Sequence, residues 1–327
     1  MTLRAAVIGA GRRGAAHTGA VADLENLAQV VGIADVDEAR GKALVAQSAP
    51  YGKAYTDAAT MLRETEPEVV YITTPPPLHR EQALAAFAVG AHVVLEKPIA
   101  LTNEDADIIG EAADKAGRMV HICHQMRYNP GVPQFREILS AQPVALTHVW
   151  NYRTAPDIPG NWNRAWGGGH VVEWGIHYLD LCRYLMATEA VEVYARYTDN
   201  VMRGAANWDN WDAYALTVQW ANGAVCGYAS TYALRPELAG SSGLSIIAAQ
   251  GMAEFAWTGG TWKTPGGDQT FAGKAGDGER ELSRTFLTAI TTGDTSGIRQ
   301  SYADAVRTHR LVLAANESAT TGVPVRL

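Results

Sequence analysis

The amino-acid sequence predicts an α/β protein with two domains: a doubly wound parallel sheet, then an α/β domain with a large open, mainly antiparallel sheet. Three observations support this. The chain has 327 residues, 47% of them hydrophobic, which exceeds the usual size of one hydrophobic core. Short apolar runs alternate with amphipathic segments as far as about His124. After a break at Asn129-Pro130-Gly131, longer alternating strands are joined by Gly and Asn turns. We place the domains at residues 1–124 and 125–327.

The strands of the first domain are apolar on both faces, as a parallel sheet covered by helices requires. Between them, Asp37 and Thr102 are helix-start signals. The predicted strands are Leu3–Ile8, Val30–Ala34, Val69–Ile72, His92–Leu95 and Met119–Ile122.

The strands of the second domain are longer and alternate in polarity. They are Ala145–Tyr152, Val191–Tyr197, Ala213–Trp220, Val225–Thr231 and Leu244–Ala249. Helices are predicted over Val171–Leu185 and, near the C-terminus, over Leu282–Ile290 and Tyr302–Ala315. Helices cover one face of such a sheet, so the other face predicts assembly into a homodimer or homotetramer.

Composition and charge exclude several classes of partner. The formal net charge of −7 comes from dispersed residues, so there is no basic surface for nucleic acid or an anionic membrane. The three cysteines are too few and too scattered for a disulfide framework or a cysteine metal site, and no metal is expected. No apolar run is long enough for a signal peptide or a membrane span. We therefore expect a cytoplasmic protein that acts on a small molecule.

A glycine-rich turn follows the first predicted strand. Gly9, Gly11 and Gly14 form a GxGxxG pattern between a strand and a helix, and Asp35 ends the second strand. This arrangement predicts a Rossmann domain that binds the pyrophosphate of a dinucleotide at the helix N-terminus, with a further phosphate contact from Arg12 or Arg13. Asp35 favours NAD because a carboxylate repels the 2′-phosphate of NADP, although Arg40 nearby keeps NADP as an alternative.

Further motifs extend this pattern along the chain. They are Thr73-Thr74-Pro75-Pro76-Pro77-Leu78-His79, Glu96-Lys97-Pro98 and the segment from Gly167 to Asp180. With the glycine-rich turn, their order and spacing resemble the Gfo/Idh/MocA family of sugar and polyol dehydrogenases. The resemblance implies hydride transfer between nicotinamide and a carbohydrate carbon, with Lys97 and His177 as catalytic residues. This chain has Glu173 where the family most often has an aspartate, and Glu173 is our third catalytic candidate.

The residue types fit this chemistry without the resemblance. Oxidation of an alcohol needs a base for the hydroxyl proton and a positive charge beside the developing alkoxide, which His177 and Lys97 can supply. Glu173 lies four residues before His177 on the predicted helix and Asp180 three after it, so all three are expected on one face. Strand ends in a doubly wound sheet point to the ligand crevice. The cofactor-site candidates there are Thr73, Thr74, Pro75, His79, Glu96 and Lys97.

Polar and aromatic residues of the second half are candidates for substrate binding. They are Arg127, Tyr152, Arg153, Trp162 and Trp166, together with Lys97, Glu173 and His177. Salt bridges are the alternative for the arginines, and core packing is the alternative for the tryptophans. We predict an NAD(P)-dependent oxidoreductase acting on a secondary hydroxyl or ketone of a sugar, inositol, glycoside or derivative. The alternatives are a non-catalytic NAD-binding sensor and a glycoside-cleaving enzyme that keeps its NAD bound.

Overall fold

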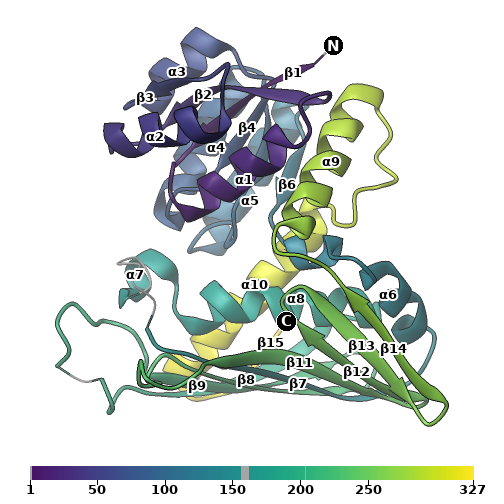
Figure 1. The fold of residues 1–327 in the computed structure, drawn as a ribbon. Coiled ribbons are helices and arrows are strands. Elements are labelled where there is room, and N and C mark those ends of the chain that lie inside the picture. The colour runs from purple at the N-terminus through teal and green to yellow at the C-terminus, as the bar shows by residue number, and fades with distance from the viewer. Residues whose placement is uncertain (1, 156–161, 203) are drawn as a thin grey trace. The chain divides into compact units, whose positions relative to one another are not determined.

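The computed structural model describes residues 2–155, 162–202 and 204–327. Two compact units make up the chain, and both are discontinuous in sequence (Figure 1). The first unit combines residues 1–128 with residues 276–306, and the second combines residues 129–275 with residues 307–327. The sequence predicted one division between residues 124 and 125. It did not predict the return to the first unit, because the apolar face of a helix does not say which sheet it covers.

The first unit contains a parallel sheet of six strands in the order β3-β2-β1-β4-β5-β6. This is the strand order of a dinucleotide-binding Rossmann sheet. The sequence missed only its edge strand β3, whose three residues include no buried side chain and so give no apolar run. The strands are β1 (Leu3–Ile8), β2 (Ala28–Ala34), β3 (Lys53–Tyr55), β4 (Val69–Ile72), β5 (His92–Leu95) and β6 (Val120–Ile122).

Helices cover both faces of this sheet. One face packs against α3, α4 and α5, and the other packs against α1, α2 and α9. The predicted helix starts are confirmed, because the side chains of Asp37 and Thr102 accept hydrogen bonds from backbone N–H groups of α2 and α5. The helices are α1 (Arg12–Ala22), α2 (Glu38–Ser48), α3 (Ala58–Thr65), α4 (His79–Ala88), α5 (Asn103–Ala116) and α9 (Asp277–Thr292), with 3₁₀ turns at Pro76–Leu78 and Gln125–Tyr128.

The second unit contains a nine-stranded sheet in the order β14-β13-β12-β11-β7-β10-β9-β8-β15. All neighbouring strands are antiparallel except β7 and β10, so the predicted mainly antiparallel sheet is confirmed. The sequence missed β12, β13 and β14, which are short and begin with glycine, and the two-residue strand β15. The strands are β7 (Val144–Tyr152), β8 (Ala190–Thr198), β9 (Ala213–Trp220), β10 (Val225–Thr231), β11 (Ser241–Ala248), β12 (Gly251–Ala256), β13 (Gly259–Thr264), β14 (Gly267–Ala272) and β15 (Val325–Arg326).

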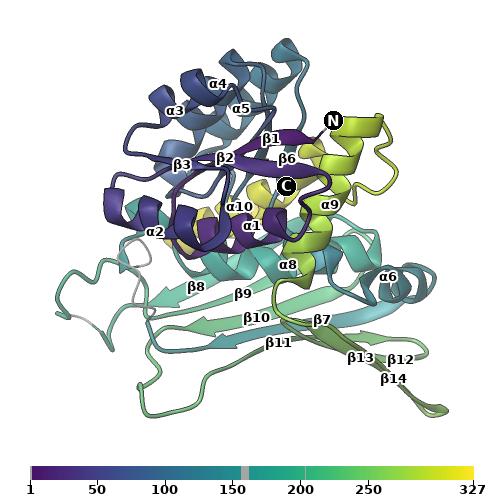
Figure 2. The ribbon, with the colours of Figure 1, turned by 45° about the horizontal axis from the view of Figure 1, so that its top comes forward.

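Helices lie over one face of this second sheet (Figure 2). They are α6 (Val132–Ser140), α7 (Arg164–Gly167) and α8 (Ile176–Met186), while α10 (Tyr302–Thr321) begins in the first unit and ends in the second. The predicted α-helix over Val171–Leu185 is wrong in its first turn, because Val171–Gly175 forms a π-helix that leads into α8. No helix in the described ranges is both long and apolar enough to cross a membrane.

Candidate functional site

The glycine-rich turn between β1 and α1 has room for a ligand at one position. Gly9 has a φ of +98°, which favours glycine, and a Cβ on Gly14 would lie 1.9 Å from the Gly9 carbonyl oxygen. A Cβ on Gly11, in contrast, would meet no atom within 4 Å. The fold therefore requires glycine at Gly9 and Gly14, whereas Gly11 keeps open space at the N-terminus of α1. A pyrophosphate fits such a position, where helix N–H groups and the helix dipole favour negative charge.

Asp35 lies beside this turn, as the sequence predicted. Its carboxylate accepts hydrogen bonds from Ala10 N (2.7 Å) and Asp37 N (2.9 Å), which join the end of β2 to the turn. The Arg40 guanidinium lies 3.8 Å from Asp35 Oδ1 and also contacts Asp37 at 3.4 Å. Arg40 is thus close enough to soften the repulsion between Asp35 and an anionic ligand.

The two arginines of the turn differ in their surroundings. Arg12 is exposed. Arg13 instead forms ion pairs with Glu96 (2.6 Å) and with Glu279 of α9 (2.9 Å). Burial opposes the charge on Arg13, but these two carboxylates outweigh it and raise the pKa of the guanidinium. Of the two arginines, Arg13 is therefore held by internal ion pairs and Arg12 is the one at the surface.

The predicted cofactor residues after β4 mostly bond to the protein itself. Thr73 Oγ1 donates to the carbonyl oxygens of Gly9 (2.8 Å) and Ile8 (3.1 Å), which fixes the glycine-rich turn. Thr74 Oγ1 donates to Gln82 Oε1 at 2.5 Å. Pro75 lies immediately before the 3₁₀ turn that starts α4. The His79 side chain is buried, so it has no exposed surface with which to contact a cofactor directly.

Glu96 forms the centre of a buried charged cluster at the end of β5. Besides Arg13, its carboxylate contacts His17 Nε2 (2.9 Å), and its second oxygen accepts a hydrogen bond from the backbone N–H of Lys97 (3.3 Å). Burial works against ionisation, yet the charges of Arg13, His17 and Lys97 lower the pKa of Glu96 well below its usual value. Glu96 is thus an anion that anchors the strand end carrying Lys97, rather than a ligand-facing group.

A metal ion is disfavoured in this cluster, although three ligand types gather there. Atoms of His17, Glu96 and Cys123 lie within 4.8 Å of one another. The Arg13 guanidinium bonds the same Glu96 oxygen that His17 contacts, which places a positive charge where a cation would bind. Burial also raises the pKa of the Cys123 thiol, whereas a metal needs the thiolate.

In the second unit, a glycine run leads into the predicted catalytic helix. Gly168 and Gly169 both have positive φ angles, of 78° and 91°, so the chain can turn sharply into His170. The π-helix that follows carries Glu173, and His177 lies in the first turn of α8. Gly175 is needed for this wider turn, because a Cβ there would lie 2.8 Å from Val171 Cγ2 and 3.2 Å from the Tyr228 ring. π-Helical turns often occur at functional sites.

Aromatic rings surround His177, which is buried with 4% exposure. Its ring lies 5.1 Å from that of Trp257, nearly perpendicular to it, and 6.2 Å from that of Trp174. The Arg153 guanidinium stacks on the Trp174 ring at 3.6 Å. Arg153 is therefore in the same aromatic cluster as His177. Trp257 follows β12 and was missed, because only the sheet brings it to α8.

Tyr232 was also missed by the sequence analysis. Tyr232 is 1% exposed, its ring lies 3.8 Å from that of His170, and its hydroxyl has no hydrogen-bond partner among the described residues. Burial and the neighbouring Glu173 raise the pKa of Tyr232 well above its usual value, so the phenol stays protonated. Its position directly after β10 was the one signal in the sequence, because strand ends commonly carry site residues.

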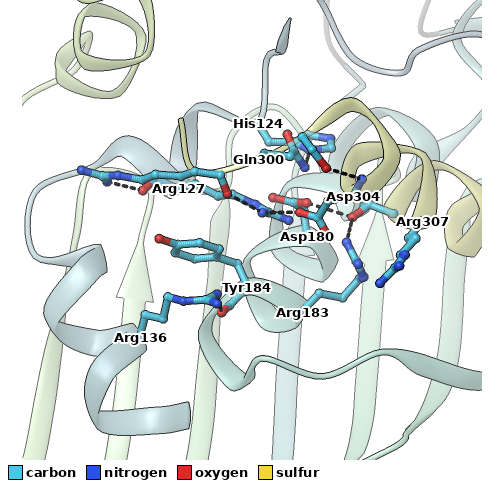
Figure 3. A network of polar contacts seen from close by, with 12 residues as sticks. His124, Arg127, Arg136, Asp180, Arg183, Tyr184, Gln300, Asp304 and Arg307 are labelled. Carbon is cyan, nitrogen blue, oxygen red and sulfur yellow. Dashed lines mark hydrogen bonds and ion pairs between the residues drawn. The ribbon is translucent and has the colours of Figure 1, made fainter. Parts of the chain in front are cut away.

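The remaining predicted substrate residues have varied surroundings. Arg127 is buried and donates to Asp304 Oδ2 (2.6 Å; Figure 3) and to the Arg299 carbonyl oxygen (3.0 Å). Arg127 thus forms an internal salt bridge, which was the alternative to substrate binding. Tyr152 ends β7 and is 39% exposed, and Trp166 on α7 is 46% exposed. The Trp162 carbonyl accepts a hydrogen bond from Asp209 N (2.8 Å).

Asp180 lies three residues after His177 on α8 and contacts a neighbouring helix. It is buried and accepts a hydrogen bond from Thr308 Oγ1 of α10 at 2.8 Å. Thr308 in turn accepts a hydrogen bond from Arg183, whose guanidinium also pairs with Glu189. Asp180 is therefore part of the packing of α8 against α10.

Comparisons with known proteins agree with this geometry. Residues 3–124 match the family model of an oxidoreductase family with an NAD-binding Rossmann fold, and residues 142–254 match the GFO/IDH/MocA C-terminal domain model. Inositol 2-dehydrogenase of Salmonella typhimurium is 32% identical over 163 residues, and this match covers 48% of each chain, or about half of that relative's length. D-Glucoside 3-dehydrogenase of Escherichia coli is 27% identical over 71% of both chains.

Solved structures share the fold along the whole chain. A levoglucosan dehydrogenase in complex with NADH superposes with a TM-score of 0.85 at 19% identity, covering 100% of this chain and 99% of the other. The myo-inositol 2-dehydrogenase of Lactobacillus plantarum superposes with a TM-score of 0.81 at 16% identity, covering 100% of both chains.

Proposed function

Because the chain belongs to the Gfo/Idh/MocA family of oxidoreductases, whose N-terminal domain is an NAD-binding Rossmann fold, we propose that it is an NAD(P)-dependent dehydrogenase or reductase. Its substrate is a sugar, inositol, glycoside or related derivative, and the reacting group is a secondary hydroxyl or a ketone of that molecule. The named relatives act on an inositol or a glucoside, which supports this substrate class.

One observation carries the proposal: the turn from Gly9 to Gly14 leaves open space at Gly11 and has Asp35 beside it. Gly9, Gly11, Gly14 and Arg12 would hold the pyrophosphate, and Asp35 would accept hydrogen bonds from the adenine ribose. We expect NAD to be preferred over NADP.

The chemistry follows from three side chains. A bound NAD(P) would supply the hydride chemistry at its nicotinamide. The Lys97 ammonium would stabilise negative charge that develops on the substrate oxygen. His177 would take the hydroxyl proton in oxidation and return it in reduction, with Glu173 one turn earlier as a hydrogen-bond acceptor for the substrate. Arg153, Tyr152, Trp162 and Trp166 are our candidates for contacts with the remaining hydroxyl groups.

The test is a screen of sugars, polyols and glycosides with NAD and NADP, following the absorbance of the reduced cofactor. With the best substrate, we expect Lys97→Ala to lower kcat about a hundredfold while the Kd for NADH changes little, because the charge acts on the alkoxide. Lys42→Ala, which removes an exposed lysine paired with Glu38, is the matched control. Near-normal turnover of Lys97→Ala would remove this residue from the catalytic group. Release of an aglycone without net NADH formation would instead favour the glycoside-cleaving alternative.

We also propose that the chain assembles into a homodimer or homotetramer through the open face of its second sheet. Leu146, Val225 and Ile247 are 42%, 41% and 36% exposed, and they lie side by side because Leu146 pairs with both of the others across β10, β7 and β11. Val225→Glu should dissociate the assembly in light scattering, whereas Val36→Glu, at a 94% exposed position elsewhere, should leave it intact.

A cytoplasmic location is consistent with the three buried free cysteines.

A further inference from the structure

The buried ring of His79 connects the two chain segments that follow β4 and β5. His79 is the first residue of α4, and its side chain has 0% exposure. Its Nε2 lies 2.8 Å from the carbonyl oxygen of Thr74, after β4. Its Nδ1 lies 3.0 Å from the carbonyl oxygen of Pro98 and 3.2 Å from that of Ile99, directly after Lys97.

All three partners of the ring are hydrogen-bond acceptors. A neutral imidazole has one N–H donor and one lone pair, so it can donate toward only one of the two segments. On the other side, a nitrogen lone pair faces a carbonyl oxygen. The single contact of Nε2 is the shortest, at 2.8 Å, but a lone pair on Nδ1 would face two carbonyl oxygens, at 3.0 and 3.2 Å, and their combined repulsion would be larger. The proton is therefore more favourable on Nδ1. In that tautomer the ring holds the segment after Lys97.

The charges around the ring agree with a neutral histidine. Burial lowers the pKa of His79, while the carbonyl oxygens of Thr74 and Ile99 and the Glu96 carboxylate oppose this effect without reversing it. The adjacent Arg80 forms its own ion pair with Asp105 at 2.6 Å. At neutral pH, the ring therefore has a single N–H to donate to the three carbonyl oxygens around it.

We propose that His79 is a positioning residue for Lys97, and that it acts through the Nδ1–H hydrogen bond to the carbonyl oxygens of Pro98 and Ile99. The inference rests on the proposed catalytic role of Lys97. Its physical basis is that a catalytic group displaced by about 1 Å can lose about a hundredfold in rate. Lys97 lies at a strand end, and the carbonyl groups one and two residues after it are fixed by this ring.

Two amide variants test the hydrogen bonds of Nδ1 and of Nε2 separately. In His79→Asn the amide nitrogen takes the place of Nδ1, and in His79→Gln it takes the place of Nε2. We expect His79→Asn to keep kcat near the wild-type value and His79→Gln to lose about tenfold or more. The Kd for NADH should stay within about twofold in both. Amide hydrogen exchange at Ile99 and Ala100 should become faster in His79→Gln only.

The matched controls are His121→Asn and His121→Gln, because His121 is buried on β6 of the same unit and is not part of the site. They should lower Tm without changing the kcat of the remaining folded enzyme. Equal losses of kcat in His79→Asn and His79→Gln, or an unchanged kcat in His79→Gln, would overturn the inference. If the wild type oxidises no substrate, the proposed function fails, but the exchange rates of the two variants still decide the role of His79.

Discussion

At the scale of single residues, charged groups in the first unit are fixed by neighbours that sequence order does not reveal. Arg13 lies between Gly11 and Gly14 of the turn, yet its guanidinium bonds Glu96 and Glu279, which lie far along the chain. Asp35 is held by two backbone N–H groups and approached by Arg40. The negative charge available to a cofactor ribose is therefore set by Asp35 and Arg40 together.

This pair gives a prediction about cofactor choice. Catalytic efficiency should be higher with NAD than with NADP, and Asp35→Ser should narrow the difference by about tenfold, or about 1.4 kcal/mol, because the repulsion of the 2′-phosphate is lost. The measurement is kcat/KM with both cofactors. Asp57→Ser, an exposed change at the start of α3 that retains a helix-capping oxygen and has no contact with Arg40, should leave the ratio unaltered. Equal efficiencies in the wild type would refute the assignment of Asp35.

At the scale of elements, the first turn of the predicted catalytic helix departs from regular α geometry. The run Val171–Gly175 is π-helical, and within it Gly175 packs so closely against Val171 and the Tyr228 ring that a Cβ there would force a shift. The wider turn sets the direction in which Glu173 leaves the helix relative to His177. The spacing of hydrophobic residues cannot predict the one extra residue of a π-helical turn, because an α-helix and a π-helix over this segment would bury the same apolar side chains.

A pair of glycine substitutions tests the importance of this turn. Gly175→Ala places a Cβ within 3.2 Å of the Tyr228 ring, so we expect the turn to shift and kcat/KM to fall about tenfold or more. Gly19→Ala in α1 meets no atom within 4 Å, and it should raise stability by about 0.5–1 kcal/mol without changing activity. Thermal unfolding and steady-state kinetics of both variants provide the comparison. Wild-type kinetics in Gly175→Ala would show that the site does not need the π-turn.

At the scale of the whole molecule, residues 276–306 complete the first unit from a distant part of the sequence. Leu282, Phe286 and Leu287 of α9 are fully buried in the core that also contains β1 and β2. The His121 ring of β6 stacks on Phe286 with a centroid distance of 5.3 Å. Burial lowers the pKa of His121 to about 3, so acid places a charge in the contact that joins the distant segment to the sheet.

The resulting pH dependence has a definite sign. The folded-state pKa of His121 is below the unfolded value of about 6.5, so its neutral form contributes stability in full above about pH 6.5. This contribution is lost as pH falls from about 6.5 toward 3, because the unfolded chain binds the proton more readily. His121→Phe keeps a ring against Phe286 but cannot titrate, so its Tm should fall less between pH 7 and pH 4 than that of the wild type. Equal decreases would indicate that other groups dominate acid unfolding.

The sequence by itself determined the parallel Rossmann sheet, the glycine-rich turn with Asp35, and the mainly antiparallel second sheet. These features depend on local hydrophobic periodicity and on residue spacings within one βαβ unit, and both can be read from neighbouring positions of the sequence. Only the tertiary structure decided that α9 returns to the first unit, that Arg13 and Arg127 form internal ion pairs, and that Trp257 and Tyr232 lie near the helix of His177. Each of these depends on contacts between segments far apart in sequence. A charged or apolar side chain specifies what kind of partner it needs, but the packing of the whole chain determines which residue supplies it.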